Sequence, residues 1–143
     1  MNPPTPLLFA TPEDAEAAFY EAIAKGNMNA LMAVWADDED VTCIHPTGQQ
    51  ISGLAAIRES WRQVLSAARL KISASRMTRW QNVLLAVHQM VENLQMGDEV
   101  AGPLLATHVF IQGPHGWRMV CRHCSASAES VQPMPGSARR VLH

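Results

Sequence analysis

The spacing of apolar residues changes near residue 70, and this change limits the possible folds more than any other feature of the sequence. Before residue 70, apolar residues recur every three or four positions, which is the period of an amphipathic helix. The spacing predicts a first helix that begins at Thr11, with Pro12 in its first turn, and ends at Gly26. A short second helix follows Asn27, and a third helix begins with Ser52 as its cap.

Beyond residue 70 the pattern is that of strands joined by tight turns. Strands are predicted over 71–80, 82–95, 104–112 and 117–125, after an earlier short strand over 41–44 and a turn over 47–50. Consecutive strands joined by tight turns form an antiparallel meander. The sequence therefore predicts an α+β fold in which three N-terminal helices pack on one face of an antiparallel sheet.

The chain length suits one domain without disulfide or metal support, since 143 residues can bury roughly 68–70% of the surface of the unfolded chain. Both ends are rich in Pro, Ser and Gly, which is typical of segments that do not pack. We expect a disordered N-terminus over 1–9, a domain over 10–127 and a flexible tail over 128–143.

Composition excludes several classes of function. Lys and Arg number 11 against 13 Asp and Glu, and a net charge of -2 argues against nucleic acid as a partner. The sequence shows neither a signal peptide nor an apolar run of roughly 18 residues, so we expect no membrane association and a cytoplasmic location. Three cysteines are an odd count, which favours reduced thiols over a disulfide framework.

The strand around residues 83–91 bears apolar residues on both faces. Three helices can cover one face of a sheet, so the second face needs another cover. We expect a symmetric homodimer formed through the outer sheet face; a sheet that curls over its own outer face is the alternative.

Polar residues on the inner faces of three strands are the strongest candidates for a site, because a buried His or Glu is either paired or functional. If the three faces point the same way, these side chains line one cavity. The polar residues are His88 and Glu92 on one strand, His108 on the next and His123 on the last; Met90 shares the face of His88, and Phe110 shares the face of His108.

Three roles are open for these residues. Three His and one Glu could bind a transition metal, but the local spacing typical of metal ligands is absent, and we expect no metal. A His in an apolar pocket beside a carboxylate could act as a base near neutral pH. The third possibility is that each His satisfies a neighbouring backbone or side-chain group. Trp35, Trp61 and Tyr20 lie on or beside helical apolar faces, where they are core residues or pocket walls.

The order of predicted elements resembles the NTF2-like superfamily, in which a curved sheet wraps around helices to form a cystatin-like cone with a pocket. Residues 19–27 with Trp35, residues 41–46 with Gly48 and Gly53, and residues 57–61 are similar to the SnoaL-like branch. The final strand, 117–125, resembles the association domain of calcium/calmodulin-dependent protein kinase II.

The resemblance implies a homodimer that binds a small, partly apolar organic ligand without a cofactor. Whether the protein is an enzyme stays open. The resemblance is compatible with cofactor-free isomerase, dehydratase or cyclase activity, and the alternative is a non-catalytic oligomerisation or association module. For an enzyme, the expected catalytic residues are His45, Glu92 and His123. The expected ligand-binding residues are Tyr20, Trp35, Trp61, His88, Met90, His108 and Phe110.

Overall fold

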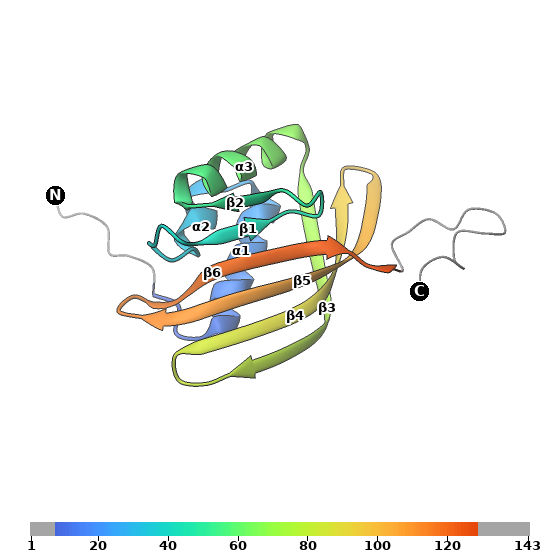
Figure 1. Ribbon diagram of the computed structural model, residues 1–143. Coiled ribbons are helices and arrows are strands. Elements are labelled where there is room, and N and C mark those ends of the chain that lie inside the picture. The colour runs from blue at the N-terminus through green and yellow to red at the C-terminus, as the bar shows by residue number, and fades with distance from the viewer. Residues whose placement is uncertain (1–7, 129–143) are drawn as a thin grey trace.

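The computed structural model describes residues 8–128, which form three helices and six strands (Figure 1). The helices are α1 (Pro12–Lys25), α2 (Met28–Ala33) and α3 (Leu54–Ala67). The strands are β1 (Thr42–Ile44), β2 (Gln50–Ser52), β3 (Leu70–Gln81), β4 (Leu85–Met96), β5 (Glu99–Gly113) and β6 (Gly116–Ala126).

The expected terminal segments lie mostly outside the described residues, which leave out 1–7 and 129–143. Phe9, which we expected to precede the domain, is buried, and its carbonyl oxygen accepts a hydrogen bond from the Trp117 amide at 2.9 Å. The folded unit therefore includes Phe9, one residue earlier than expected.

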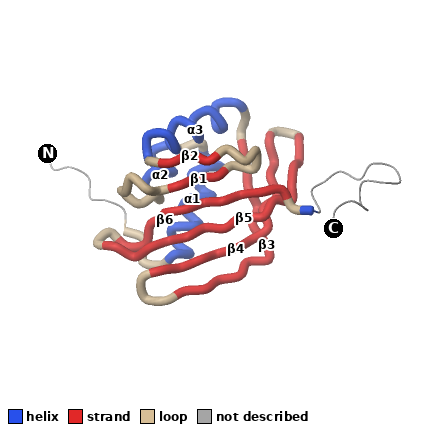
Figure 2. The backbone as a smooth tube through the Cα atoms, in the orientation of Figure 1, coloured by secondary structure: helices blue, strands red, loops and turns tan. Residues whose placement is uncertain are grey.

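The strands form one sheet in the order β2-β1-β6-β5-β4-β3, and the helices cover one of its faces (Figures 1 and 2). This confirms the predicted α+β class. The sheet is mixed rather than fully antiparallel, because β1 pairs in parallel with β6. The meander prediction holds for β3 to β6, which tight turns connect in sequence. The parallel pairing of β1 with β6 joins strands that are far apart in the sequence, so the pattern of turns does not predict it.

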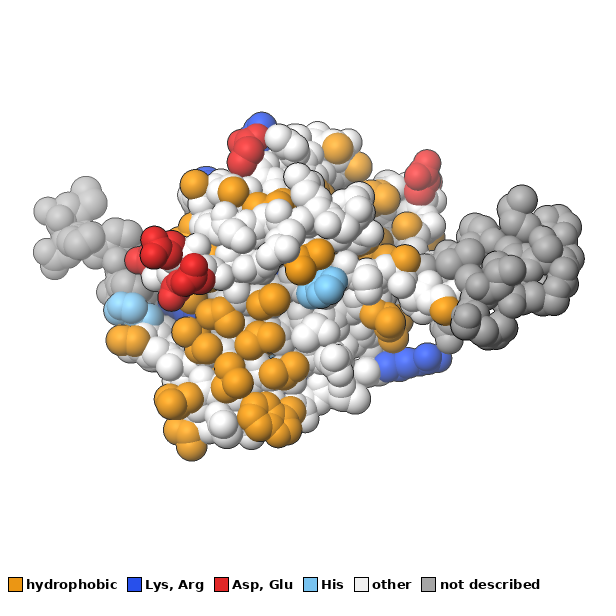
Figure 3. All heavy atoms as spheres, viewed as in Figure 1, with side chains coloured by type: hydrophobic (Ala, Val, Ile, Leu, Met, Phe, Trp, Pro, Cys, Tyr) orange, Lys and Arg blue, Asp and Glu red, His pale blue; other side chains and the backbone are white. Residues whose placement is uncertain are grey.

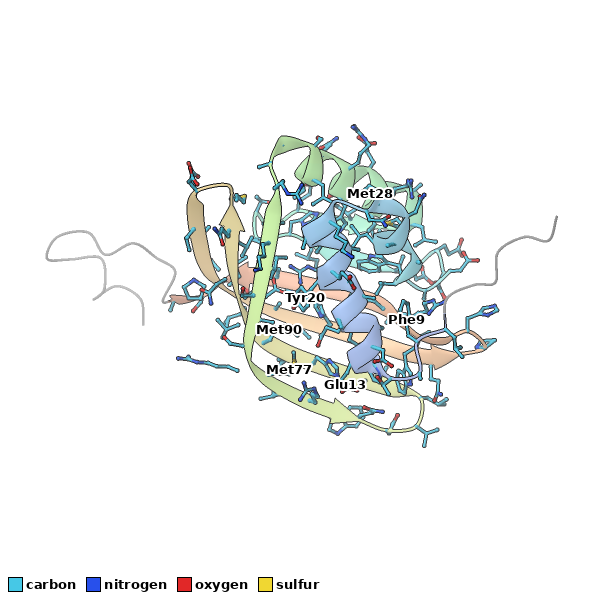
Figure 4. The ribbon with its side chains drawn as sticks, turned by 180° about the vertical axis from the view of Figure 1, so that it is seen from behind. Phe9, Glu13, Tyr20, Met28, Met77 and Met90 are labelled. Atoms are coloured by element: carbon cyan, nitrogen blue, oxygen red, sulfur yellow. The ribbon has the colours of Figure 1, made fainter. Side chains whose placement is uncertain are left out.

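Helix α1 begins and ends at the residues that its caps and apolar spacing predict. The Thr11 hydroxyl accepts a hydrogen bond from the Asp14 amide at 3.0 Å, and Gly26 closes the helix in the left-handed conformation. Its buried face contains Phe19 and Ile23 and lies across the concave face of the sheet (Figure 4). Helix α1 thus carries the core against which the sheet curls.

The third helix begins one residue later than predicted. Ser52 belongs to the short strand β2, which the sequence pattern had left partly as a turn, and Gly53 precedes the helix without a side-chain cap. Strand β2 contributes one buried side chain, Ile51, opposite Cys43 of β1. A three-residue strand with one buried residue has too little alternation to be recognised.

A bulge in β6 decides which side chains enter the interior. Val109 and Phe110 of β5 pair with Cys121 and Met119, so Val120 has no partner in the register. An extra residue reverses the alternation of every side chain beyond it. Beyond the bulge, Arg122 and Cys124 are buried, whereas His123 is exposed.

Candidate functional site

A cavity of about 260 Å³ lies between helix α3 and the curled ends of the long strands. Its walls are mainly apolar, and polar groups come from the segment after β1, from α3 and from β6. It is smaller than the roughly 300–1,000 Å³ of sites for drug-sized molecules. The lining residues are His45, Pro46, Thr47, Gln49, Ser60, Trp61, Gln63, Val64, Leu70, Ile72, Leu94, Leu104 and Arg122.

His45 enters this cavity directly after β1. Its imidazole Nε2 lies 2.5 Å from the Ser60 hydroxyl oxygen, and the edge of its ring meets Trp61 with ring centroids 5.4 Å apart. Burial, together with the positive charge of Arg122, lowers the pKa of His45 below its usual 6.5. The imidazole is therefore neutral at pH 7.

Glu16 of α1 connects two histidines in the interior. Its carboxylate oxygens lie 3.0 Å from His88 Nδ1 and 2.7 Å from His108 Nδ1. Burial by itself would raise the pKa of Glu16, but the hydrogen bonds and charges of His108 and His88 outweigh it and lower the pKa to about 2. Glu16 is ionised and accepts from both rings.

Arg122 of β6 occupies the centre of the same interior. Its guanidinium donates two hydrogen bonds of 2.8 Å to the two carboxylate oxygens of Glu92, and the Tyr20 hydroxyl donates to Glu92 at 2.6 Å. A third contact, of 2.7 Å, joins Arg122 Nη1 to His108 Nε2. Because a guanidinium can only donate, His108 Nε2 accepts, and His108 is the neutral tautomer with its proton on Nδ1.

The pKa shifts agree with this arrangement. Burial opposes ionisation of Glu92, but the hydrogen bond and charge of Arg122 lower its pKa below the usual value. Burial, followed by the charge of Glu92, raises the pKa of Tyr20. The pKa of His108 is lowered mainly by burial. The interior is thus a linked set of ionised carboxylates, a neutral His108 and a protonated Tyr20 around one guanidinium.

The structure offers no metal site in the part of the chain that it describes. No group of three or more His, Cys, Asp or Glu side chains within residues 8–128 could hold an ion. Glu16 and Arg122 occupy the hydrogen-bonding positions of His108 that a metal would need.

Nine of the ten predicted site residues fall into four places. His45 and Trp61 border the cavity. Four others, Tyr20, His88, Glu92 and His108, belong to the buried network. Met90 and Phe110 are buried core residues. Trp35 is also buried and lines a different hollow of about 400 Å³ at the β5–β6 turn.

The predicted place of His123 inside the cone is wrong. The bulge at Val120 turns its side chain to the outer sheet face, where it lies in register with Ile44 of β1 and Thr107 of β5. Arg122 takes the interior position instead. His123 therefore has no contact with the cavity.

Three residues of this interior were missed from the sequence: Glu16, Ser60 and Arg122. A signal existed for two of them. Glu16 lies three positions before the buried Phe19, and Ser60 lies three positions after the buried Ile57, so helical spacing puts each on the same face as a buried residue. For Arg122 no sequence signal existed, because strict alternation places it on the outer face.

Helices on one face of a curled six-stranded sheet, with a cavity at one end, define the cystatin-like, or NTF2-like, class of α+β proteins. A protein from Nostoc punctiforme with a cystatin-like fold shares this architecture, with a TM-score of 0.69 at 15% identity over 84% of this chain and 96% of that chain. The model of the SnoaL-like domain family matches residues 13–129. The chain belongs to the SnoaL-like domain family.

Two other solved structures are more similar in sequence. One, from Thiobacillus denitrificans, is a candidate calcium/calmodulin-dependent protein kinase type II association domain. It is 37% identical to this chain, with a TM-score of 0.75, and the match covers 84% of this chain and 98% of that chain. The other, from Streptomyces avermitilis, is a candidate dehydratase of the NTF2-like family; it is 25% identical, with a TM-score of 0.73, over 79% of this chain and 91% of that chain. No curated protein matches the chain.

Within residues 8–128, no helix has both the length and the apolar character that crossing a membrane requires.

Proposed function

We propose that this protein binds a small, partly apolar organic molecule in the cavity beneath α3. The observation that carries the proposal is the unfilled cavity, which has apolar walls such as Ile72 and Leu104 and the polar groups of His45 and Arg122. Apolar walls with a few convergent polar groups are the usual composition of small-molecule sites. The cavity size restricts the ligand to a small molecule.

The interior network supports this proposal because it satisfies its own charges. Glu92 neutralises the Arg122 guanidinium, and Glu16 accepts from His88 and His108. The network needs no ligand to balance it, so a molecule in the cavity faces a preorganised wall. Within residues 8–128, the buried Arg122 Nε has no hydrogen-bond partner, so one donor of the guanidinium remains unpaired.

The chemistry that fits the cavity is cofactor-free acid and base catalysis, with His45 as the base. A neutral imidazole in a mainly apolar cavity can accept a proton at pH 7. Glu92 does not border the cavity, so its part is to hold Arg122 in place. The similarity to the candidate dehydratase from Streptomyces avermitilis is consistent with this chemistry.

Binding is tested with 4-nitrophenyl butyl ether as the probe, by isothermal titration. The variant Val64→Trp places a large ring in the cavity, and Val100→Trp places the same ring on an exposed position of β5. We expect Val64→Trp to abolish binding and Val100→Trp to bind like the parent protein. Equal binding by both variants, or none by the parent, would contradict the proposed site.

The second part of the proposal is a homodimer formed through the outer sheet face. Apolar side chains gather over β3 to β6 on this face (Figure 3). Trp80, Val87, Val109 and Cys121 lie side by side in register across the four strands, and Trp80 is 56% exposed. A contiguous apolar patch of this kind on a sheet is typical of a subunit interface.

Light scattering tests the dimer. We expect the parent protein to have twice the mass of the subunit and Val87→Asp to have the mass of one subunit, because the carboxylate lies in the middle of the apolar row. Ala55→Asp, on the exposed face of α3, is the control and should remain dimeric. A parent protein that is monomeric would refute the dimer.

A second candidate function is a non-catalytic association module. The 37% identity to the candidate association domain from Thiobacillus denitrificans favours it. It predicts a cavity that does not take the ether probe. The binding experiment above therefore separates the candidates.

A further inference from the structure

A serine and a histidine share one hydrogen bond at the wall of the cavity. Ser60 comes from the middle of α3, and its hydroxyl oxygen lies 2.5 Å from His45 Nε2. Both residues border the cavity. The pair has the arrangement of a nucleophile and its base, in which the nitrogen receives the hydroxyl proton.

The backbone holds both partners firmly. Pro46 keeps His45 extended, the His45 amide donates to the Gln49 carbonyl at 3.1 Å, and the His45 carbonyl accepts from the Gly48 amide at 2.8 Å. Ser60 lies within a 14-residue helix, next to the buried Trp61, whose ring also contacts the imidazole. Ser60 is therefore positioned by a helix, and His45 by a hydrogen-bonded turn directly after β1.

The surroundings keep His45 in the neutral form that can accept a proton from Ser60. A neutral imidazole has a free lone pair on one nitrogen, and burial together with Arg122 keeps His45 neutral. Arg122 also borders the cavity, and its guanidinium, although paired with Glu92, can still favour the negative charge that develops when a hydroxyl attacks a carbonyl.

We propose that Ser60 is a nucleophile, activated by His45, that attacks the acyl carbon of small carboxylic esters held in the cavity. The inference rests on the proposed small-molecule site and specifies its substrate class. As the Ser60 oxygen bonds to the acyl carbon, His45 Nε2 takes the hydroxyl proton. His45 then protonates the departing alkoxide as its bond to the acyl carbon breaks. Water, deprotonated by His45, cleaves the acyl-serine, and Ser60 recovers its proton as the carboxylic acid leaves.

The test combines two probes on the full chain. Diisopropyl fluorophosphate loses fluoride to an activated serine, and peptide mass mapping locates the adduct. Hydrolysis of 4-nitrophenyl butyrate measures turnover. We expect the adduct on Ser60, and a fall of about 100-fold or more in ester hydrolysis in both Ser60→Ala and His45→Gln. Because the pKa of His45 is lowered, hydrolysis should rise with pH, and the midpoint of the rise should lie below the usual histidine value of 6.5.

Ser66→Ala is the matched control, because Ser66 lies on the same helix but is exposed and donates to the Gln63 carbonyl. It should keep the parent rate and the adduct on Ser60. Binding of 4-nitrophenyl butyl ether, which has no acyl carbon, shows that each variant is folded and that its cavity is open. An adduct that is absent from Ser60, or a Ser60→Ala protein that hydrolyses the ester at the parent rate, overturns the inference.

The ether probe separates the two proposals. If the parent protein binds the ether but Ser60 is not labelled, the nucleophile inference fails and the ligand site stands. If the parent protein neither binds the ether nor is labelled, both fail.

Discussion

Replacing Glu92 with Gln tests whether the ion pair with Arg122 organises the interior. Both side chains are almost fully buried, with exposed fractions of 0% for Glu92 and 3% for Arg122. The substitution keeps the shape but leaves the guanidinium without its counter-charge and weakens two hydrogen bonds of 2.8 Å. Breaking a buried pair in this way costs about 3–5 kcal/mol, a large part of the roughly 5–15 kcal/mol that stabilises a domain.

Urea unfolding at pH 7 and fixed protein concentration measures this loss. The double variant Glu92→Leu with Arg122→Met, which removes both charges, should be more stable than Glu92→Gln because no charge is left buried alone. Glu59→Gln is the control, because its ion pair with Arg62 is exposed, and we expect no measurable change. A loss below about 1 kcal/mol in Glu92→Gln, or a double variant less stable than Glu92→Gln, would refute the reasoning.

Glu16→Gln should flatten the loss of stability in acid. The pKa of Glu16 is about 2 in the folded protein and 4.5 when exposed, which corresponds to about 3 kcal/mol of the free energy of unfolding. This contribution is present above pH 4.5 and disappears as the pH falls toward 2. Urea unfolding at several pH values measures it. Gly116→Ala should lower the melting temperature more than Gly97→Ala. Both glycines have positive φ, but a Cβ on Gly116 would overlap the Phe9 carbonyl oxygen, whereas Gly97 has open space; equal melting temperatures would contradict this.

Much of the fold could be predicted from short-range patterns. The caps at Thr11 and Gly26 defined α1, and alternation on β4 and β5 correctly placed His88 and His108 on the inner face. These predictions succeeded because helix ends and strand faces depend on residues only a few positions apart. The exposed residues Val83 and Leu84, which lie in the turn before β4, show that strand limits are less certain.

The candidate site could be predicted only in part. His45 was predicted through the resemblance to the NTF2-like superfamily, and Trp61 because it lies on a helical apolar face. The partner of His45 was missed, because Ser60 is 15 positions away and nothing local connects the two. The roles predicted for Tyr20, Glu92 and His108 in ligand binding or catalysis stay predictions.

The sequence by itself determined the α+β order of elements and the inward direction of His88 and His108, since both follow from local periodicity. Only the tertiary structure decided that Arg122 and not His123 faces inward, because one unpaired residue at Val120 reverses the alternation. It also brought Glu16, from α1, between His88 and His108. Register and long-range pairing depend on the packing of the whole sheet around α1, and no local pattern contains that information.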